Sequence, residues 1–135
     1  MRYRGIHVGL DETKGLFVIG GIKKKFKTFQ EAKQAIDLFY KKAKPYQALR
    51  VTGFDAPDII TIYGVFGNNL VIETEYNGEP FGIDTTFGSE PVFYKVNPES
   101  LKIVDEYQKI RQAQRENDKK LSVLKHSFEE LNWRK

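Results

Sequence analysis

Two runs of β-branched and aromatic residues, separated by a short turn, most constrain the fold of this chain. They are residues 59–66 (IITIYGVF) and 70–76 (LVIETEY). Such residues favour strands, and Gly/Asn pairs between them favour hairpins. Turn signals occur at Gly67-Asn68-Asn69, Asn77-Gly78 and Gly88-Ser89. Residues 46–97 therefore predict an acidic antiparallel β-meander.

Residues 1–45 predict a basic β-β-β-α unit. Its strands are expected at residues 2–10, 16–21 and 22–29. A helix should follow, because Thr28 and Glu31 have the spacing of a capping box and apolar residues then recur at helical intervals. Pro45 should end that helix. The first sheet should thus have three strands, with the basic residues on its solvent face.

Residues 98–135 predict a C-terminal amphipathic helix. Asn97 suits the N-cap and Pro98 the first helical position. A heptad series follows at Ile103, Tyr107, Ile110, Gln114, Asn117, Leu121, Leu124, Phe128 and Leu131. A self-associating helix and a helix packed on the sheet would both show this pattern, and Asp118 would split the helix in two if it capped a second one. We expect the helix to build a homodimer or a dimer-based oligomer, with Gln114 and Asn117 setting its register.

The three segments predict an α+β fold: a three-stranded sheet plus helix, an antiparallel β-meander, and a long C-terminal helix, in one compact domain. No apolar run approaches the roughly 18 residues that span a membrane, and the first residues do not resemble a secretory signal. The chain has no cysteine, which excludes disulfides and thiolate metal sites. We therefore expect a cytoplasmic protein, in the host cytosol if a phage encodes it.

Charge is distributed unevenly along the chain, whose net charge is +4. Residues 1–50 carry 12 Lys/Arg and 4 Asp/Glu, residues 51–97 carry 1 and 7, and residues 98–135 carry 9 and 7. This segregation indicates either that the basic part faces an anionic partner or that the basic and acidic parts face each other.

Catalytic and metal-binding patterns are missing from the sequence. His7 and His126 lie far apart and have no ligand or relay partner at a suitable spacing. Glu73 and Glu75 alternate onto one face of a strand, which is typical of a solvent face. No nucleotide-binding glycine motif or nucleophile elbow occurs. We predict a protein that is not an enzyme and needs no cofactor or metal.

A basic group near the N-terminus forms one candidate site. It consists of Arg4, Lys23, Lys24, Lys25 and Lys27. Lysines on a small sheet would neutralise phosphates of DNA, or would keep a sheet edge soluble. The stretches RYRGI and FVIGGIKKKFKTFQEAKQAID resemble the three-strand-and-helix modules of AP2-type and integrase arm-type DNA-binding domains. The resemblance implies a DNA-binding role for these residues.

A pair of arginines forms the second candidate site. Arg111 and Arg115 lie four residues apart on the expected helix, where like charges repel by about 0.2–0.5 kcal/mol. Arg111 has no acidic residue three or four positions away. An anion between the two guanidinium groups would relieve this repulsion, and phosphate suits their geometry. Alternatively, the pair is exposed or forms salt bridges with the acidic meander.

A β-rich body followed by a helix with Arg-x-x-x-Arg, after a Phe and an Asn, resembles the phage anti-Thoeris sponge family. The resemblance implies non-enzymatic sequestration of a cyclic ADP-ribose-like signal at sites between subunits. Arg111 and Arg115 would then hold phosphate, Phe87 would stack on the base, and Asn97 would bond it. Asn97 is also explained by the N-cap position alone.

Two functions follow from these candidate sites. The first is a phage-type anti-defence protein that sequesters a cyclic nucleotide through Arg111, Arg115, Phe87 and Asn97. The alternative is a phage-type accessory DNA-binding protein that uses the basic N-terminal sheet. In both, the partner is a phosphate-bearing anion and no bond is broken.

Overall fold

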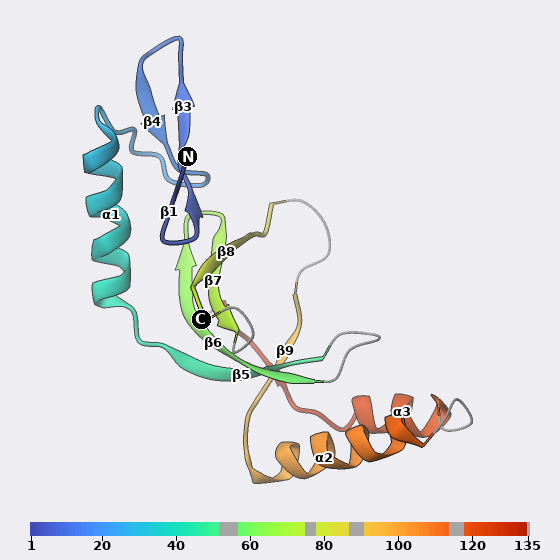
Figure 1. The fold of residues 1–135 in the computed structure, drawn as a ribbon. Coiled ribbons are helices and arrows are strands. Elements are labelled where there is room, and N and C mark those ends of the chain that lie inside the picture. Colours follow the sequence, from blue (N-terminus) through green and yellow to red (C-terminus); the bar gives the residue numbers. More distant parts are fainter. Residues whose placement is uncertain (52–56, 75–77, 87–90, 114–117, 135) are drawn as a thin grey trace. The chain divides into compact units, whose positions relative to one another are not determined.

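The computed structural model describes residues 1–51, 57–74, 78–86, 91–113 and 118–134. The chain forms two compact units: unit 1 comprises residues 1–46 and 61–90, and unit 2 comprises residues 47–60 and 91–135. Helices and antiparallel strands occur together, so the predicted α+β class is confirmed (Figure 1). The basic first segment and the acidic residues 61–90 both belong to unit 1, but no salt bridge among the described residues joins them, so both explanations of the charge distribution stay predictions.

The described chain contains three helices and ten strands. The helices are α1 (Phe29–Lys42), α2 (Pro98–Gln112) and α3 (Asp118–Lys125). The strands are β1 (Arg2–Tyr3), β2 (Ile6–His7), β3 (Gly9–Asp11), β4 (Leu16–Val18), β5 (Tyr46–Arg50), β6 (Asp58–Phe66), β7 (Asn69–Thr74), β8 (Phe81–Asp84), β9 (Phe93–Tyr94) and β10 (Glu130–Leu131). They form two two-stranded sheets, β1-β2 and β3-β4, and one six-stranded sheet of order β10-β9-β5-β6-β7-β8.

The predicted three-stranded N-terminal sheet is wrong in detail. Its first strand is divided by a turn, because Arg4 and Gly5 adopt positive φ angles of 48° and 82°. Its third strand is reduced to one bridge, in which Phe17 and Phe26 exchange backbone hydrogen bonds of 2.7 and 2.8 Å. Gly21 (φ 81°) turns the chain after β4, so residues 22–25 leave the sheet. The four predicted lysines therefore lie on a loop segment and not on a strand face.

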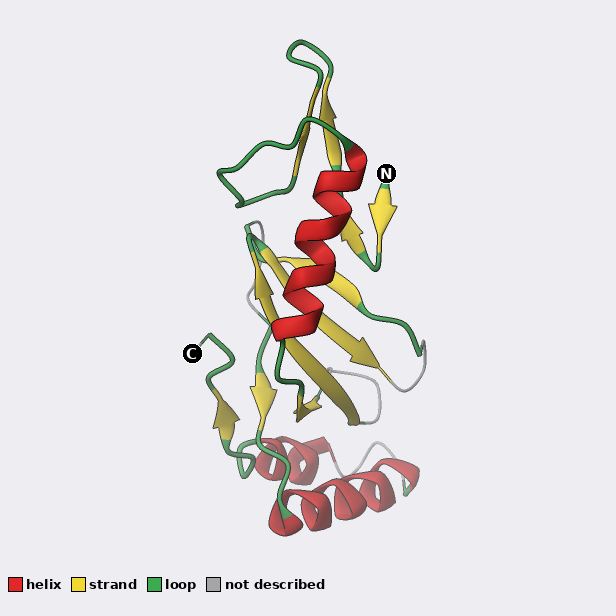
Figure 2. Cartoon of the chain, turned by 90° about the vertical axis from the view of Figure 1, so that its left-hand side faces the viewer, coloured by secondary structure: helices red, strands yellow, loops and turns green. Residues whose placement is uncertain are grey.

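Helix α1 forms as predicted and covers the core of unit 1. The Thr28 hydroxyl accepts a hydrogen bond from the Glu31 backbone N–H at 3.1 Å, while the Glu31 carboxylate accepts one from the Lys27 N–H. The helix lies alongside the strands of unit 1 (Figure 2). The buried cluster that it covers contains Ile6, Val8, Ile19, Phe26, Ala32, Ile36 and Val71.

The predicted meander holds for β6, β7 and β8, which are consecutive neighbours in the sheet, whereas β5, which lies beside β6, was not predicted as a strand. The chain turns between β6 and β7 at Gly67 and Asn68, with a φ of 62° at Gly67. β9 does not continue the meander, because it pairs antiparallel with β5. The remaining predicted turn residues Asn77, Gly88 and Ser89 lie outside the described residues.

A single long C-terminal helix is wrong, and the alternative of two helices is confirmed. Helix α2 ends at Gln112, and the Ala113 N–H donates to the Ile110 carbonyl at 3.0 Å. Helix α3 begins at Asp118, and the two helices lie side by side in unit 2 (Figure 1). After α3 the chain leaves the helix and forms β10, an antiparallel partner of β9.

The heptad residues are largely covered within unit 2. Tyr107 and Phe128 are buried, and the Phe128 ring lies 5.3 Å from that of Tyr94. Ile110 and Leu124 are half-buried. The heptad pattern therefore does not by itself require a second chain, and the predicted homodimer stays a prediction. Gln114 and Asn117 lie outside the described residues.

Candidate functional site

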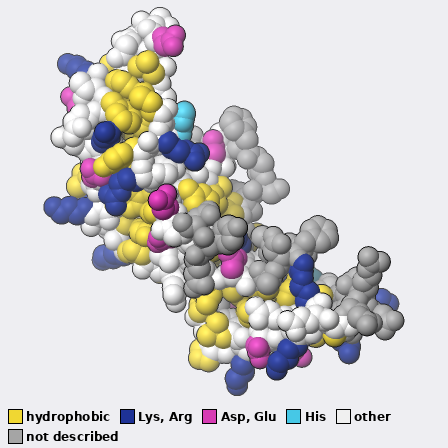
Figure 3. Space-filling view, viewed as in Figure 1, with side chains coloured by type: hydrophobic (Ala, Val, Ile, Leu, Met, Phe, Trp, Pro, Cys, Tyr) yellow, Lys and Arg dark blue, Asp and Glu magenta, His cyan; other side chains and the backbone are white. Residues whose placement is uncertain are grey.

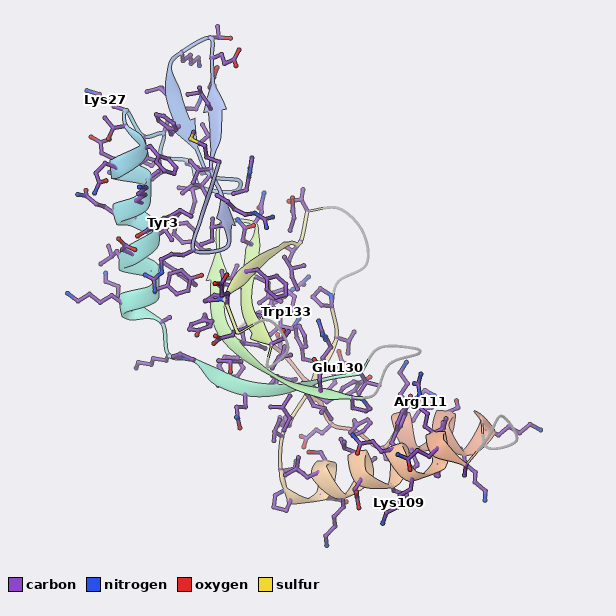
Figure 4. The ribbon with its side chains drawn as sticks, viewed as in Figure 1. Tyr3, Lys27, Lys109, Arg111, Glu130 and Trp133 are labelled. Carbon is purple, nitrogen blue, oxygen red and sulfur yellow. The ribbon has the colours of Figure 1, made fainter. Side chains whose placement is uncertain are left out.

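The four predicted lysines lie together on the segment of residues 22–27 between β4 and α1, here called the lysine segment. Lys23, Lys24, Lys25 and Lys27 are all exposed. Lys24 Nζ lies 5.8 Å from the centre of the Phe26 ring. Within the described parts of the chain none of the four forms a salt bridge. Figure 4 shows Lys27 near the amino end of α1.

Two apolar side chains hold the lysine segment against unit 1. Phe26 is 4% exposed, and its backbone is bridged to Phe17. Ile22 packs against the same buried cluster, and its N–H donates to the Ile19 carbonyl at 3.0 Å. The segment is thus anchored near both ends, and its lysine side chains start from a defined backbone.

Arg4, the fifth residue of the predicted DNA site, has a different environment. Its Nη1 lies 3.1 Å from Asp37 Oδ1 in a salt bridge whose side chains are 43% and 48% exposed. Its guanidinium carbon lies 4.0 Å from the centre of the Tyr40 ring. Its carbonyl accepts a 2.6 Å hydrogen bond from the Tyr40 hydroxyl. The fold therefore uses Arg4 to hold the β1–β2 turn against α1.

A network of tyrosines surrounds this contact, and the sequence analysis missed it. The Tyr3 hydroxyl donates to Asp37 Oδ1 at 2.8 Å, and this hydrogen bond raises the pKa of Tyr3. The Tyr63 hydroxyl donates to Glu73 Oε2 at 2.7 Å, which likewise raises the Tyr63 pKa. Burial raises the pKa of Tyr40 to about 12. These phenols remain protonated near neutral pH and act as hydrogen-bond donors, since raised pKa values oppose formation of a phenolate nucleophile.

The second predicted site is only partly described. Arg111 is exposed in the last turn of α2 and forms no salt bridge with the described residues. Its neighbour Lys109 pairs with Asp105 at 3.4 Å. Figure 4 shows both cations on α2. Arg115 and Phe87 lie outside the described residues.

Asn97 is the N-cap of α2, as predicted. Its Oδ1 accepts from the Ser100 N–H at 2.8 Å, and its own N–H donates to Ser100 Oγ at 2.9 Å. Asn97 and Arg111 are fourteen residues apart, which corresponds to about 21 Å along a helix. One chain therefore does not bring these two residues to one ligand, whereas the four lysines share one segment of six residues.

Two surface pockets have linings that include none of the predicted site residues. In unit 1 a pocket of about 510 Å³ is lined by Arg2, Gly5, Glu79, Pro80, Phe81 and Gly82. In unit 2 a pocket of about 350 Å³ is lined by Glu106, Ile110, Lys119, Lys120, Val123 and Leu124.

The described residues contain neither a metal-binding cluster nor a membrane-spanning helix. No group of three or more His, Asp or Glu side chains there has the geometry to hold a metal ion. No helix in the described ranges is long and apolar enough to cross a membrane. On the face drawn in Figure 3, Lys and Arg side chains are distributed over unit 1 and are not gathered in a single cluster.

Comparison with protein families, with curated proteins and with solved structures found no match to this chain.

Proposed function

We propose that unit 1 binds the phosphate backbone of DNA through the lysine segment, and that the protein acts by binding without catalysing a reaction. The observation that carries this proposal is the presence of four exposed lysines, without salt bridges to any described residue, on one anchored segment. Neutralising phosphates releases condensed counterions, which makes such a surface a favourable site for a polyanion.

The residue types in the segment favour contact with phosphates over contact with bases. Lysine is a compact point charge on a flexible stem, whereas base recognition in the major groove relies strongly on Arg, Asn and Gln. The remaining side chains of the segment are Ile22 and the buried Phe26. Binding should therefore depend little on DNA sequence, since phosphate contacts carry no sequence information.

The salt dependence of binding to a duplex oligonucleotide tests the proposal. If all four lysines neutralise phosphates, changing Lys23, Lys24, Lys25 and Lys27 to Gln should reduce the slope of log K against log salt by about 3.6, from roughly 0.9 per phosphate. Fluorescence anisotropy at several salt concentrations measures this slope.

The matched control changes four other exposed lysines of unit 1 to Gln, which removes the same charge. These are Lys14, Lys41, Lys42 and Lys44. The control should retain most of the slope. Equal losses in the two quadruple variants would show that net charge, and not the lysine segment, governs binding and would overturn the proposal.

We also propose a second candidate, the sequestration of a cyclic ADP-ribose-like nucleotide by a phage-type anti-defence sponge. It is favoured by one observation, the exposed Arg111 that has no salt bridge to a described residue. Arg115, Phe87 and Asn97 would complete the site. Because Asn97 lies at the opposite end of α2 from Arg111, a homodimer or larger oligomer would have to bring them together from different chains.

Thermal unfolding with a panel of cyclic nucleotides tests the second candidate. A ligand at 100 times its Kd stabilises a protein by about 2.7 kcal/mol, so the binding nucleotide should clearly raise the melting temperature. Arg111→Gln should abolish this rise. Lys109→Gln, which removes a neighbouring cation that is already paired with Asp105, should not. A light-scattering mass of one chain would contradict the shared site.

A further inference from the structure

We infer that the turn between β6 and β7, formed by Gly67 and Asn68, is a positioning element for the lysine segment. This inference rests on the proposed DNA-binding function and deepens it. Gly67 and Asn68 carry no charge and lie at least 40 positions from the lysines in sequence. The inference gives them the role of holding the lysines in one arrangement.

The turn contacts the chain just before the lysine segment. The Asn68 N–H donates to the Gly20 carbonyl at 2.9 Å. Added Cβ atoms show how close the two backbones are: one at Gly67 would lie 2.2 Å from the Gly20 oxygen, and one at Gly21 would lie 2.4 Å from the Asn68 nitrogen. Glycine is therefore needed on both sides of this contact.

The turn also meets the first residue of the lysine segment. A Cβ at Gly67 would lie 3.1 Å from Ile22 Cγ1, so the Ile22 side chain rests against the turn as well as against the core. The segment is consequently held by the β6–β7 turn at one end and by the Phe17–Phe26 bridge at the other.

The turn is itself tied to the rest of unit 1. The Asn68 carbonyl accepts hydrogen bonds from the Thr85 N–H at 2.9 Å and from Thr85 Oγ1 at 3.0 Å. Thr85 directly follows β8. A continuous series of backbone contacts therefore runs from the edge strand of the large sheet, through Asn68 and Gly20, to the lysines.

Anchoring of this kind should strengthen binding through preorganisation. A loop that is already ordered loses little conformational freedom when it meets a ligand, whereas a released loop must be ordered at that moment. The lysines would keep their charge in either case. Releasing the anchor should therefore lower DNA affinity without any change in charge.

Gly67→Ala and Gly15→Ala form a matched pair that tests the inference. The two glycines have similar positive φ angles, 62° and 65°, and both lie in unit 1. A Cβ at Gly67 collides with Gly20, while a Cβ at Gly15 meets nothing within 4 Å. Both changes thus carry the same backbone strain, and only Gly67→Ala disturbs the anchor.

DNA binding is measured by anisotropy at a temperature where circular dichroism shows each variant to be folded. Gly67→Ala should weaken binding about tenfold, as expected if one or two residues must be newly ordered. Gly15→Ala should bind like the unchanged protein. Equal affinities of the two variants would overturn the inference.

A milder variant decides the question if Gly67→Ala does not fold. Thr85→Val removes only the Oγ1 hydrogen bond to Asn68 and should weaken binding about two- to threefold. Thr13→Val, at an exposed threonine of the β3–β4 turn, should leave affinity unchanged. An unchanged affinity in Thr85→Val would then overturn the inference.

The two proposals fail in distinguishable ways. If the quadruple lysine variant binds DNA as well as the unchanged protein, the proposed function itself fails. If that variant loses binding while Gly67→Ala matches Gly15→Ala, the function stands and the positioning role of the turn is wrong.

Discussion

In each of the two units, one predicted binding residue makes structural contacts and the other described ones are exposed. In unit 1 Arg4 contacts Asp37 and Tyr40 of helix α1, and the four lysines are exposed. In unit 2 Asn97 caps helix α2, and Arg111 is exposed. The units differ in how the free cations are supported, because the lysine segment is anchored near both ends, whereas Arg111 lies in the last helical turn before Ala113.

The comparison shows that exposed cations do not by themselves make a binding surface; the backbone that carries them must also be held in place. Both groups of cations look alike in sequence, because each is a short cluster of Lys or Arg residues. In the structure the four lysines share a short segment whose backbone position is set by the buried Phe26 and by the turn at Gly67. Four exposed lysines on one anchored segment can neutralise more phosphates than a single exposed arginine, which favours unit 1 as the binding unit.

The largest effect is expected at the anchor of the lysine segment. Phe26→Ala should reduce the free energy of unfolding by about 3–5 kcal/mol, because it leaves a cavity in the core. Lys25→Ala, at the adjacent exposed position, should change it by less than about 0.5 kcal/mol. Urea unfolding compares the two. Similar midpoints would mean that Phe26 does not anchor the segment.

A smaller effect is expected at the cap of α2. Asn97→Ala should destabilise unit 2 by about 1 kcal/mol, since the Ser100 N–H loses its partner. Asn97→Ser should retain most of the stability because serine also caps helices. Melting temperatures test this pair. Binding of a nucleotide that is lost in Asn97→Ser, with stability intact, would instead establish a ligand role for Asn97.

Arg4→Gln should lower the free energy of unfolding by only about 0.5–1 kcal/mol. The salt bridge that it removes is half-exposed, and the contact with Tyr40 adds only a modest cation–π interaction. Arg2→Gln, two residues earlier and also exposed, is the control for charge. Both should leave the salt slope of DNA binding nearly intact. A slope that falls only in Arg4→Gln would place Arg4 in the DNA site.

The smallest effect is expected at alkaline pH. The Tyr40 pKa is raised from 10.0 in the unfolded chain to about 12 by burial, so the unfolded state loses this proton first as the pH rises. The contribution of the protonated Tyr40 hydroxyl to the free energy of unfolding is complete below pH 10 and is lost as the pH rises toward 12. Partial exposure of the ring reduces the size of this effect.

Urea midpoints at pH 9 and pH 11.5 measure the alkaline loss. Tyr40→Phe should lose less stability over this interval than the unchanged protein. Tyr63, Tyr3, Tyr46 and Tyr94 also have raised pKa values, so some loss should remain in the variant. An identical loss in both proteins would rule out Tyr40 as a contributor.

The four lysines of the candidate site could be predicted from the sequence, but the contacts that hold their segment in place could not. The four lysines are consecutive apart from Phe26, and their clustering needed no structure to find. The Gly20–Asn68 contact could not be predicted, because it joins residues 48 positions apart and is made by backbone atoms that carry no residue signature. The glycines at 20, 21 and 67 were the one available signal, and they indicated only turns.

The sequence by itself determined the features that depend on neighbouring residues. The caps at Thr28 and Asn97 and the turn at Gly67 each involve residues within about four positions, and all three formed as expected. The α+β class followed from the same local patterns, since periodicity and capping act within one element.

Only the tertiary structure decided where these elements stop and which of them pair. The heptad pattern continues through Gln114 and Asn117, yet the helix ends at Gln112 and the chain folds back. The first strand is divided at Arg4, whose positive φ accompanies contacts with Tyr40 and Asp37 in a distant helix. Contacts between remote residues outweigh local preferences of a few tenths of a kcal/mol per residue, and they converted an expected strand of lysines into an anchored loop.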